Sequence, residues 1–177
     1  MQLTPAMQNF ILHWGEMGSR WGVNRSVAQI HALLHLSPDP LTADDICDAL
    51  GIARSNVSTG LKELQGWDLV KSSRKLGDRR DHFTSVRDMF DLVDAVVKGR
   101  REREFAPTMR ALGEVLEEAK SDGTPNTVLD RMNETHRVMK MFDDWYTDIA
   151  RLPRSVHMTI LKLGAKLTRL LPKGKTD

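Results

Sequence analysis

The stretch between residues 41 and 85 constrains the fold most, because it encodes two short helices and, directly after them, a ribbon of two strands. Thr42 followed by Asp45 is typical of a capping box at the start of a helix. Gly51 stands where a helix ends in a left-handed residue. A second helix is expected at about 54–65, with apolar side chains at helical spacing on one face. Two helices joined by a short turn that contains glycine form a helix-turn-helix.

The ribbon that follows these helices carries a basic tip. Strands are expected at 69–73 and 82–85, and residues 74–80 would join them. A hairpin directly after a helix-turn-helix makes the winged version of the motif. The sequence therefore predicts a winged helix-turn-helix with a small, two-stranded wing.

The outward side chains of the second helix and of the ribbon tip suit contacts with DNA. A helix with its side chains is about 10–12 Å across, which fits a major groove about 12 Å wide. Asparagine can pair with adenine, arginine with guanine, and serine or threonine with a base or a phosphate. Arginine at a ribbon tip suits a narrow minor groove. The expected contact residues are Arg54, Ser55, Asn56, Ser58, Thr59 and Lys62 on the helix and Arg74, Lys75, Arg79 and Arg80 on the ribbon.

Charge supports this interpretation only together with the motif. The chain of 177 residues has a formal net charge of +2, so its total charge does not indicate a nucleic-acid partner. Residues 53–82, however, contain seven cations and four anions, and this segment is more positive than the rest of the chain. A solvated face is the simpler explanation of charge alone. Its coincidence with the helix-turn-helix favours DNA.

Three segments of the motif, 51–64, 66–70 and 77–81, resemble the winged-helix core of MarR-type transcriptional regulators, most of all their GbsR-like branch. The upstream run at 15–34 and the long helical tail favour that branch. The resemblance implies a homodimeric regulator, with a repressor as the first expectation. It also implies that the second helix of each subunit enters the major groove of double-stranded DNA.

The resemblance gives expectations for single residues as well. It implies that the wing acts at the minor groove through Asp78 and Arg80. The family often has serine where this chain has Ala53, and alanine is a poor N-cap that costs about 1 kcal/mol. The second helix therefore starts either at Ser55 or without a cap at its N-terminus.

An effector pocket is a further expectation from the resemblance. It implies relatives that respond to small molecules, quaternary amines among them, and such a cation prefers an aromatic cage. Aromatic side chains at helical spacing are more often part of a core, so both interpretations stand. The residues assigned to this pocket are Phe10, Trp14, Trp21, Phe90, Trp145 and Tyr146.

Amphipathic helices flank the motif on both sides. Before it, helices are expected at 3–19 and 24–36, and glycines 15, 18 and 22 are interpreted as the turn that ends the first. After it, apolar rows at helical spacing extend over 86–170, with a break near Ala106, a new start at Thr124 and a stop at 172–174. The charged run at 98–104 is interpreted as a solvated face. The apolar face of the first helix is expected to contain Leu3, Met7, Phe10, Trp14 and Met17.

These rows set the fold class and the expected domains. The chain is predicted to be mainly α: residues 1–22 pack on the helical region, 23–86 form the winged domain, and 87–177 form a helical dimerisation and effector region. The apolar rows exceed what one small winged domain can cover, and an exposed apolar stripe is unstable in water. Two-fold self-association is the simplest way to bury this apolar surface. It would place two second helices about 34–36 Å apart, or a multiple of this, on a roughly palindromic site.

Other classes of function find little support. The sequence contains no motif of a phosphate-binding loop, a dinucleotide fold, a serine hydrolase or a zinc protease, so no catalytic residue, cofactor or metal is expected. His31 and His35 have a spacing that can hold a metal, but a structural role is the simpler interpretation. Cys47 is the only cysteine, and neither a signal peptide nor a membrane span is evident, so we expect a cytoplasmic protein. A protein-interaction module on the same scaffold remains the alternative.

Overall fold

The computed structural model describes residues 2–170. The chain divides into two compact units, Met1–Arg103 and Glu104–Asp177, which are described separately. The expected domains 1–22, 23–86 and 87–177 stay a prediction, since this division rests on packing alone. None of the helices within the described residues combines the length and the apolar character that a membrane crossing needs.

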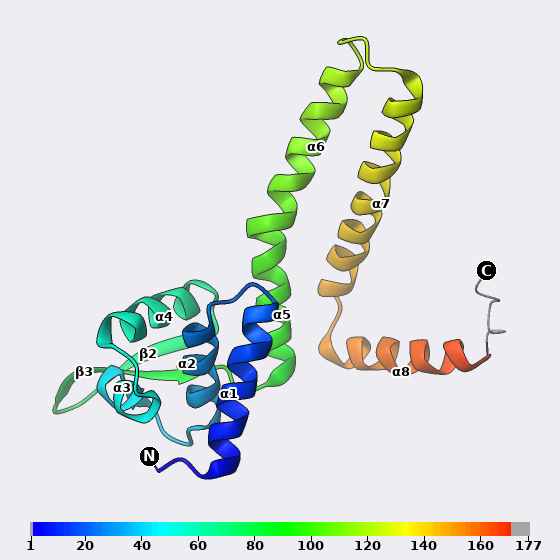
Figure 1. The fold of residues 1–177 in the computed structure, drawn as a ribbon. Coiled ribbons are helices and arrows are strands. Elements are labelled where there is room, and N and C mark those ends of the chain that lie inside the picture. Colours follow the sequence, from blue (N-terminus) through cyan, green and yellow to red (C-terminus); the bar gives the residue numbers. More distant parts are fainter. Residues whose placement is uncertain (1, 171–177) are drawn as a thin grey trace. The chain divides into compact units, whose positions relative to one another are not determined.

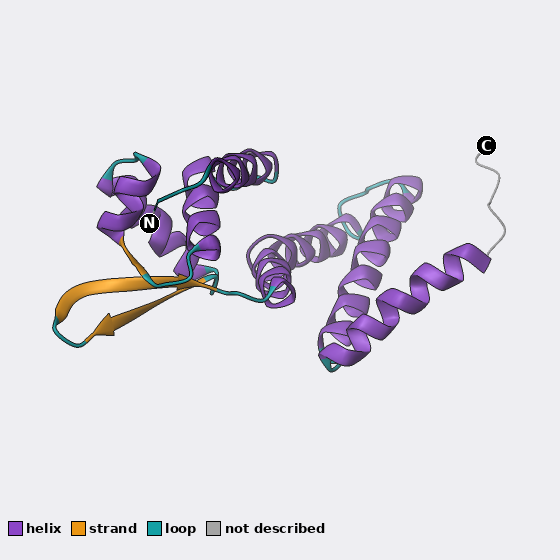
Figure 2. Ribbon diagram, turned by 90° about the horizontal axis from the view of Figure 1, so that it is seen from below, coloured by secondary structure: helices purple, strands orange, loops and turns teal. Residues whose placement is uncertain are grey.

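The first unit contains five helices and a three-stranded sheet in the order that the sequence predicted for its helices (Figures 1 and 2). The third and fourth helices form the helix-turn-helix. The elements are α1 (Pro5–Arg20), α2 (Arg25–Leu36), β1 (Leu41–Thr42), α3 (Ala43–Leu50), α4 (Arg54–Gly66), β2 (Val70–Lys75), β3 (Asp78–Ser85) and α5 (Met89–Arg100).

The start and end signals of α3 act as the sequence predicted. The Thr42 hydroxyl accepts a hydrogen bond from the Asp45 backbone N–H, and the Asp45 carboxylate accepts one from the Thr42 backbone N–H at 2.8 Å. The Thr42 hydroxyl also donates a hydrogen bond of 2.6 Å to the Asp45 carboxylate. This bond, and then the one from the Thr42 backbone N–H, holds the pKa of Asp45 below its ordinary value. Gly51 ends α3 in the left-handed region with a φ of 64°. Helix α3 is therefore fixed by local chemistry at both of its ends.

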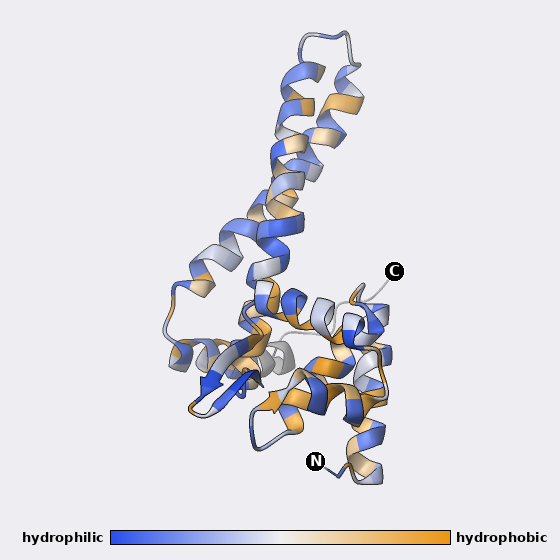
Figure 3. Cartoon of the chain, turned by 90° about the vertical axis from the view of Figure 1, so that its left-hand side faces the viewer, coloured by the Kyte–Doolittle hydropathy of each residue, from blue (hydrophilic) through white to orange (hydrophobic). Residues whose placement is uncertain are grey.

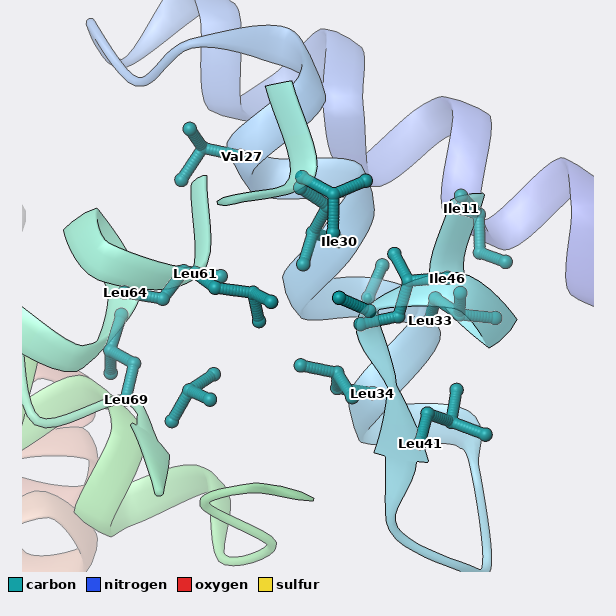
Figure 4. Close-up of a cluster of buried hydrophobic side chains, with 14 of the residues drawn as sticks. Ile11, Val27, Ile30, Leu33, Leu34, Leu41, Ile46, Leu61, Leu64 and Leu69 are labelled. Atoms are coloured by element: carbon teal, nitrogen blue, oxygen red, sulfur yellow. The ribbon is translucent and has the colours of Figure 1, made fainter. Parts of the chain in front are cut away.

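The core of the first unit lies where α2, α3, α4 and the sheet meet (Figure 4). Each helix contributes the apolar face that its spacing predicted, and α2 contributes the most. Burying one such side chain stabilises the fold by about 1.5–3 kcal/mol. The largest apolar side chains that are almost completely buried are Ile30, Leu33, Leu34, Ile46 and Val57. Cys47 lies at the margin of this core and is half-buried.

Helix α1 contacts α2 through glycines that the sequence analysis assigned wrongly. Gly15 and Gly18 do not form a turn but lie inside α1, and both are buried. A Cβ atom on Gly18 would lie 2.6 Å from the Cβ atom of Ala28, so the two helices approach closely there. The buried stripe consequently runs through Ile11 rather than Phe10, whose side chain is 39% exposed. The other members of the expected face, Leu3, Met7, Trp14 and Met17, are half-buried.

The sheet has three strands, although the sequence predicted two. Strands β2 and β3 pair antiparallel as expected, with Val70 opposite Ser85, and Gly77 turns the ribbon with a φ of 83°. The additional strand β1 pairs with the other edge of β3, giving the order β1-β3-β2. Because β1 immediately precedes α3, this pairing ties the base of the ribbon to the helix-turn-helix.

The second unit is helical. Helical residues continue from α5 without a gap through a π-helical segment, Arg101–Phe105, into α6 (Ala106–Ala119). Helix α6 packs beside α7 (Asn126–Ala150), burying Leu116 and Ala119 (Figure 1). The last helix is α8 (Arg154–Leu170). It contacts α7 through His157 Nε2, which lies 2.6 Å from the Ile149 carbonyl oxygen. The helix stop expected at 172–174 lies outside the described residues.

The start of α7 differs from the prediction in its cap. Pro125 is the N-cap residue, and no side chain caps the helix. The Thr124 hydroxyl instead donates a hydrogen bond of 2.6 Å to the Asp122 carboxylate. Thr124 therefore shapes the turn before α7 and does not satisfy the first N–H groups of the helix.

Candidate nucleic-acid interface

Helix α4 begins at Arg54 without a side-chain cap, which decides between the two starts that the sequence left open. Ala53 is its N-cap residue and makes no side-chain hydrogen bond. The first N–H groups of an uncapped helix lack intrahelical partners. An exposed helix start of this kind suits an anion such as a phosphate, because the helix dipole is positive there.

One face of α4 packs against the core, so the opposite face is exposed to solvent. Val57, Leu61 and Leu64 are buried, and Gly60 allows a close approach to α2. A Cβ atom on Gly60 would lie 2.7 Å from Ile30 Cδ1. All six side chains of α4 that the sequence assigned to DNA contact are exposed on the opposite face: Arg54, Ser55, Asn56, Ser58, Thr59 and Lys62.

The exposed face of α4 and the sheet enclose a concave surface of about 430 Å³, which we call the α4–wing groove. Five of the ten expected contact residues line it, namely Arg54, Ser58, Lys62, Arg79 and Arg80. The other five are exposed on α4 or the ribbon outside its lining: Ser55, Asn56, Thr59, Arg74 and Lys75. Contact of any of these ten residues with DNA stays a prediction.

Sequence reasoning missed several polar residues of the α4–wing groove. Gln65 donates a hydrogen bond of 3.3 Å to the Ser72 hydroxyl and so connects α4 to β2. Helical spacing contained the signal for Gln65, which follows Lys62 by three positions and Ser58 by seven. No local pattern indicated Ser72, because only the pairing of the ribbon brings it beside α4.

Carboxylates hold three of the cations around the groove. Arg54 pairs with Asp44, the Arg74 Nε atom lies 3.5 Å from Asp81 Oδ1, and Arg80 pairs with Asp78. All three arginine side chains are more than half exposed, so these pairs contribute little to stability. They restrict where each guanidinium points.

The wing pair is the best defined of the three. Arg80 donates hydrogen bonds to Asp78 from its backbone N–H at 3.0 Å and from its Nε and Nη2 atoms at 3.0 and 2.6 Å. These bonds from Arg80 hold the pKa of Asp78 well below its usual range. His82 Nε2 lies 3.6 Å from the same carboxylate. The ribbon around the pair is mostly hydrophilic (Figure 3), as a surface that meets phosphates requires.

The aromatic residues expected to form an effector pocket lie in both units. Phe10 and Trp14 stack on α1 with ring centroids 5.5 Å apart. Trp21 follows α1 and is 64% exposed, and Phe90 lies in the first turn of α5 and is 40% exposed. Trp145 and Tyr146 lie on α7, in the second unit. The pocket stays a prediction.

The histidine pair of α2 packs beside an aromatic ring of α1. His31 is buried between Trp14 and His35, with ring centroids 6.1 Å from each. Burial, and then the nearby His35, lowers the pKa of His31 to about 4. Among the described residues, no group of three or more histidine, cysteine or acidic side chains could hold a metal ion.

Three comparisons with known proteins agree with this geometry. Residues 21–81 match the MarR family. The HTH-type transcriptional repressor GbsR of Bacillus subtilis (strain 168) is 28% identical over 102 residues, 58% of this chain, and the chain spans only about half (54%) of that protein. A crystal structure of a transcriptional regulator has the same fold, with a TM-score of 0.56 and 20% identity over 82% of this chain and 95% of that one. The part of the chain that matches the MarR family is therefore the winged helix-turn-helix at residues 21–81.

Proposed function

We propose that this protein is a DNA-binding transcriptional regulator. The observation that carries the proposal is the α4–wing groove, where a recognition helix with a fully exposed polar face and a basic ribbon line one concave surface. Arg54, Ser58 and Lys62 would face the major groove from α4. Arg79 and Arg80 would approach the phosphates or the minor groove from β3.

The regulator is a repressor in this proposal. Support comes from the Bacillus subtilis relative, which is a transcriptional repressor, and from the match of the winged domain to the MarR family. A repressor needs an operator that it occupies in preference to other DNA. The exposed Asn56 and Arg54 provide side chains that can discriminate between base pairs.

The regulator acts as a homodimer on a roughly palindromic operator in this proposal. Support comes from α7, which has no buried residue among those described. Met141, Phe142 and Trp145 on this helix are 54%, 60% and 61% exposed. A second copy of the chain would cover such a face by two-fold symmetry. A small molecule that changes the spacing of the two α4 helices would then change the affinity for the operator.

Selection of DNA fragments from a random pool, followed by fluorescence anisotropy, tests the proposal. The expected result is a set of selected fragments with a common, roughly palindromic sequence and an affinity that falls steeply with salt. Folded wild-type protein that binds neither selected nor random DNA at low salt would contradict it.

A protein-interaction module is the second candidate function. The observation in its favour is that carboxylates already pair with Arg54, Arg74 and Arg80, so the basic surface is partly neutralised. Retention on heparin or on calf-thymus DNA across a salt gradient separates the two candidates. A protein-interaction module with a net charge of +2 would be retained weakly and would elute at low salt. It would also enrich no specific DNA fragment in the selection.

A further inference from the structure

The end of α4 that is remote from the predicted DNA contacts is held by α5. Helix α4 ends at Gly66, and Trp67 follows as its C-cap residue. The backbone of α5 packs directly on the indole ring at Gly99, where an added Cβ atom would lie only 2.5 Å from Trp67 Cε3. Gly99 is buried, and Trp67 is half-buried.

Arg103 adds a second contact to the same end of α4. Its guanidinium lies over the Trp67 ring, with Cζ 4.1 Å from the ring centroid. Its Nη2 atom donates a hydrogen bond to the Gly66 carbonyl. The last carbonyl groups of a helix lack intrahelical donors, and a cation is favourable at the negative end of the helix dipole. Arg103 therefore satisfies both needs while it makes a cation–π contact.

We propose that Arg103, Gly99, Trp67 and Gly66 form a latch that positions the recognition helix for DNA. Arg103 is the positioning residue of this latch, and the proposal rests on the proposed function. Helix α4 has 13 residues and is therefore about 20 Å long. A small tilt at its C-terminal end displaces Arg54 at its other end, where the expected base contacts lie. A binding site whose side chains are displaced by about 1 Å loses much of its function, so the latch would set the affinity.

The position of Arg103 in the chain means that the geometry of the segment after α5 can open or close the latch. Arg103 belongs to the π-helical segment Arg101–Phe105, which follows α5. Segments of π-helix are rare and occur frequently at functional sites. A change between π-helical and α-helical geometry here would rotate Arg103 relative to α5, and the contact with Trp67 would open. The latch thus makes the orientation of α4 depend on the geometry of this segment.

Arg103 is an exposed residue, so a direct contact with a DNA phosphate is the competing explanation for any effect of Arg103 on DNA binding. The two explanations predict different salt dependences. A lost phosphate contact lowers the slope of log affinity against log salt by about 0.9. A lost positioning contact lowers the affinity and leaves that slope unchanged, because the number of neutralised phosphates stays the same.

Arg103→Ala and Gly99→Ala are the two variants that open the latch in different ways. Gly99→Ala pushes the Trp67 ring away while all charges remain, and alanine also favours the helix. Each variant should lose about three- to tenfold in affinity for a selected fragment with an unchanged salt slope. Arg103→Lys keeps the charge but not the planar guanidinium, so it should restore only part of the loss.

Two matched controls accompany these variants. Lys98→Ala removes an exposed cation of α5, the helix that precedes Arg103. Gly113→Ala adds a methyl group in α6 at a position where nothing lies within 4 Å. Both controls should bind the selected fragment as the wild type does. Hydrogen exchange in the absence of DNA should be at least threefold faster in Arg103→Ala than in the wild type at the amides of Trp67, Asp68 and Leu69, which hydrogen-bond to the last turn of α4.

The outcomes separate the latch from the proposed function. Wild-type protein that binds no DNA contradicts the proposed function, and with it this role of Arg103. Wild-type binding with an unchanged affinity in Arg103→Ala and Gly99→Ala contradicts the latch alone. A lowered salt slope in Arg103→Ala with normal binding by Gly99→Ala would contradict the latch and indicate that Arg103 contacts a phosphate. Unchanged hydrogen exchange in Arg103→Ala would show that Arg103 does not hold this end of α4.

Discussion

Arg80 shows, at the scale of single residues, how a neighbouring carboxylate can prepare a cation for DNA. Asp78 accepts hydrogen bonds from both the backbone N–H and the guanidinium of Arg80, so the side chain is restrained before any partner arrives. A restrained side chain loses less conformational entropy on binding than a free one. The pair is worth little for folding because Arg80 is 57% exposed. Its value would lie in binding.

Arg80→Ala should weaken binding to selected and random DNA alike and lower the salt slope by about one counterion. The reason is that a wing arginine contacts the sugar–phosphate backbone or a minor groove that carries little sequence information. Fluorescence anisotropy at several salt concentrations measures both quantities. Arg151→Ala, which removes an exposed cation of the second unit, serves as the control and should leave the slope unchanged. An unaltered slope in Arg80→Ala would reject its assignment to DNA.

His31 makes the stability of the first unit depend on pH. Its pKa is about 4 in the folded protein because burial penalises the charged form, whereas an unfolded histidine has a pKa of 6.5. Between these values the unfolded chain binds more protons, so the free energy of unfolding falls as pH falls from 6.5 to 4. The slope approaches about 1.4 kcal/mol per pH unit from this group. Urea unfolding at pH 4.5–7 should show a weaker pH dependence in His31→Phe; equal dependence would contradict the assignment.

At the scale of elements, glycines decide how the helices pack. Gly18 lets α1 approach α2, and Gly60 lets α4 approach α2, because an added Cβ atom would lie 2.6 and 2.7 Å from side-chain carbons of α2. Helix α2 is consequently contacted by the other helices on two sides through positions without side chains. This arrangement brings α4 close to the core and turns its polar face outward.

Gly18→Ala should lower the free energy of unfolding by about 1–3 kcal/mol, because the added methyl group collides with Ala28 and the helix pair must separate. Gly113→Ala, with open space at the same distance, should instead raise it by about 0.5–1 kcal/mol through helix propensity. Urea denaturation compares the two variants with the wild type. If both glycines respond in the same direction, the close packing of α1 on α2 is wrong.

The helix-turn-helix could be predicted from the sequence because its signals are local. The capping box of α3, the glycine after it and the inward rows of α2 and α4 depend on neighbours within a few residues. Contacts between distant segments left no such signal. The two-residue strand β1 cannot be predicted, because it is too short to show alternation. Gly18 has the pattern of a turn residue, because its partner Ala28 belongs to another helix.

The charged run at 98–104 is the clearest failure of local reasoning. Its mixed charges predict a solvated face, yet Arg103 contacts Trp67 and Gly66, and Arg100 donates a hydrogen bond to the Trp21 carbonyl. The partners of these two arginines lie 37 and 79 positions earlier in the chain. Charge pattern alone could not distinguish arginines that bind helix ends from arginines in water.

At the scale of the whole molecule, the exposed apolar side chains of α7 set the expected assembly. Phe142 and Trp145 are 60% and 61% exposed, and large aromatic side chains bury the most area when a partner covers them. A two-fold interface that contains them would present two α4 helices to one DNA molecule. Two half-sites would then contribute to the same binding event.

The double variant Phe142→Ser, Trp145→Ser should raise the dissociation constant of the dimer at least tenfold, because two aromatic anchors of the interface are lost. Sedimentation equilibrium measures this constant. Lys140→Ser, which changes an exposed side chain of the same helix that pairs with Asp144, is the control. A wild-type protein that is monomeric at all concentrations tested would contradict the homodimer, as would an unchanged dissociation constant in the double variant.

Asn56 tests whether the exposed face of α4 recognises a DNA sequence. The measurement is the ratio of affinities for a selected fragment and for random DNA, in the wild type and in Asn56→Ala. Asn56 is exposed near the start of α4, so its loss should cost about 1–3 kcal/mol on the selected fragment and little on random DNA. The ratio should therefore fall by at least fivefold. An equal ratio in both proteins, or a wild type without preference for any fragment, would contradict the account.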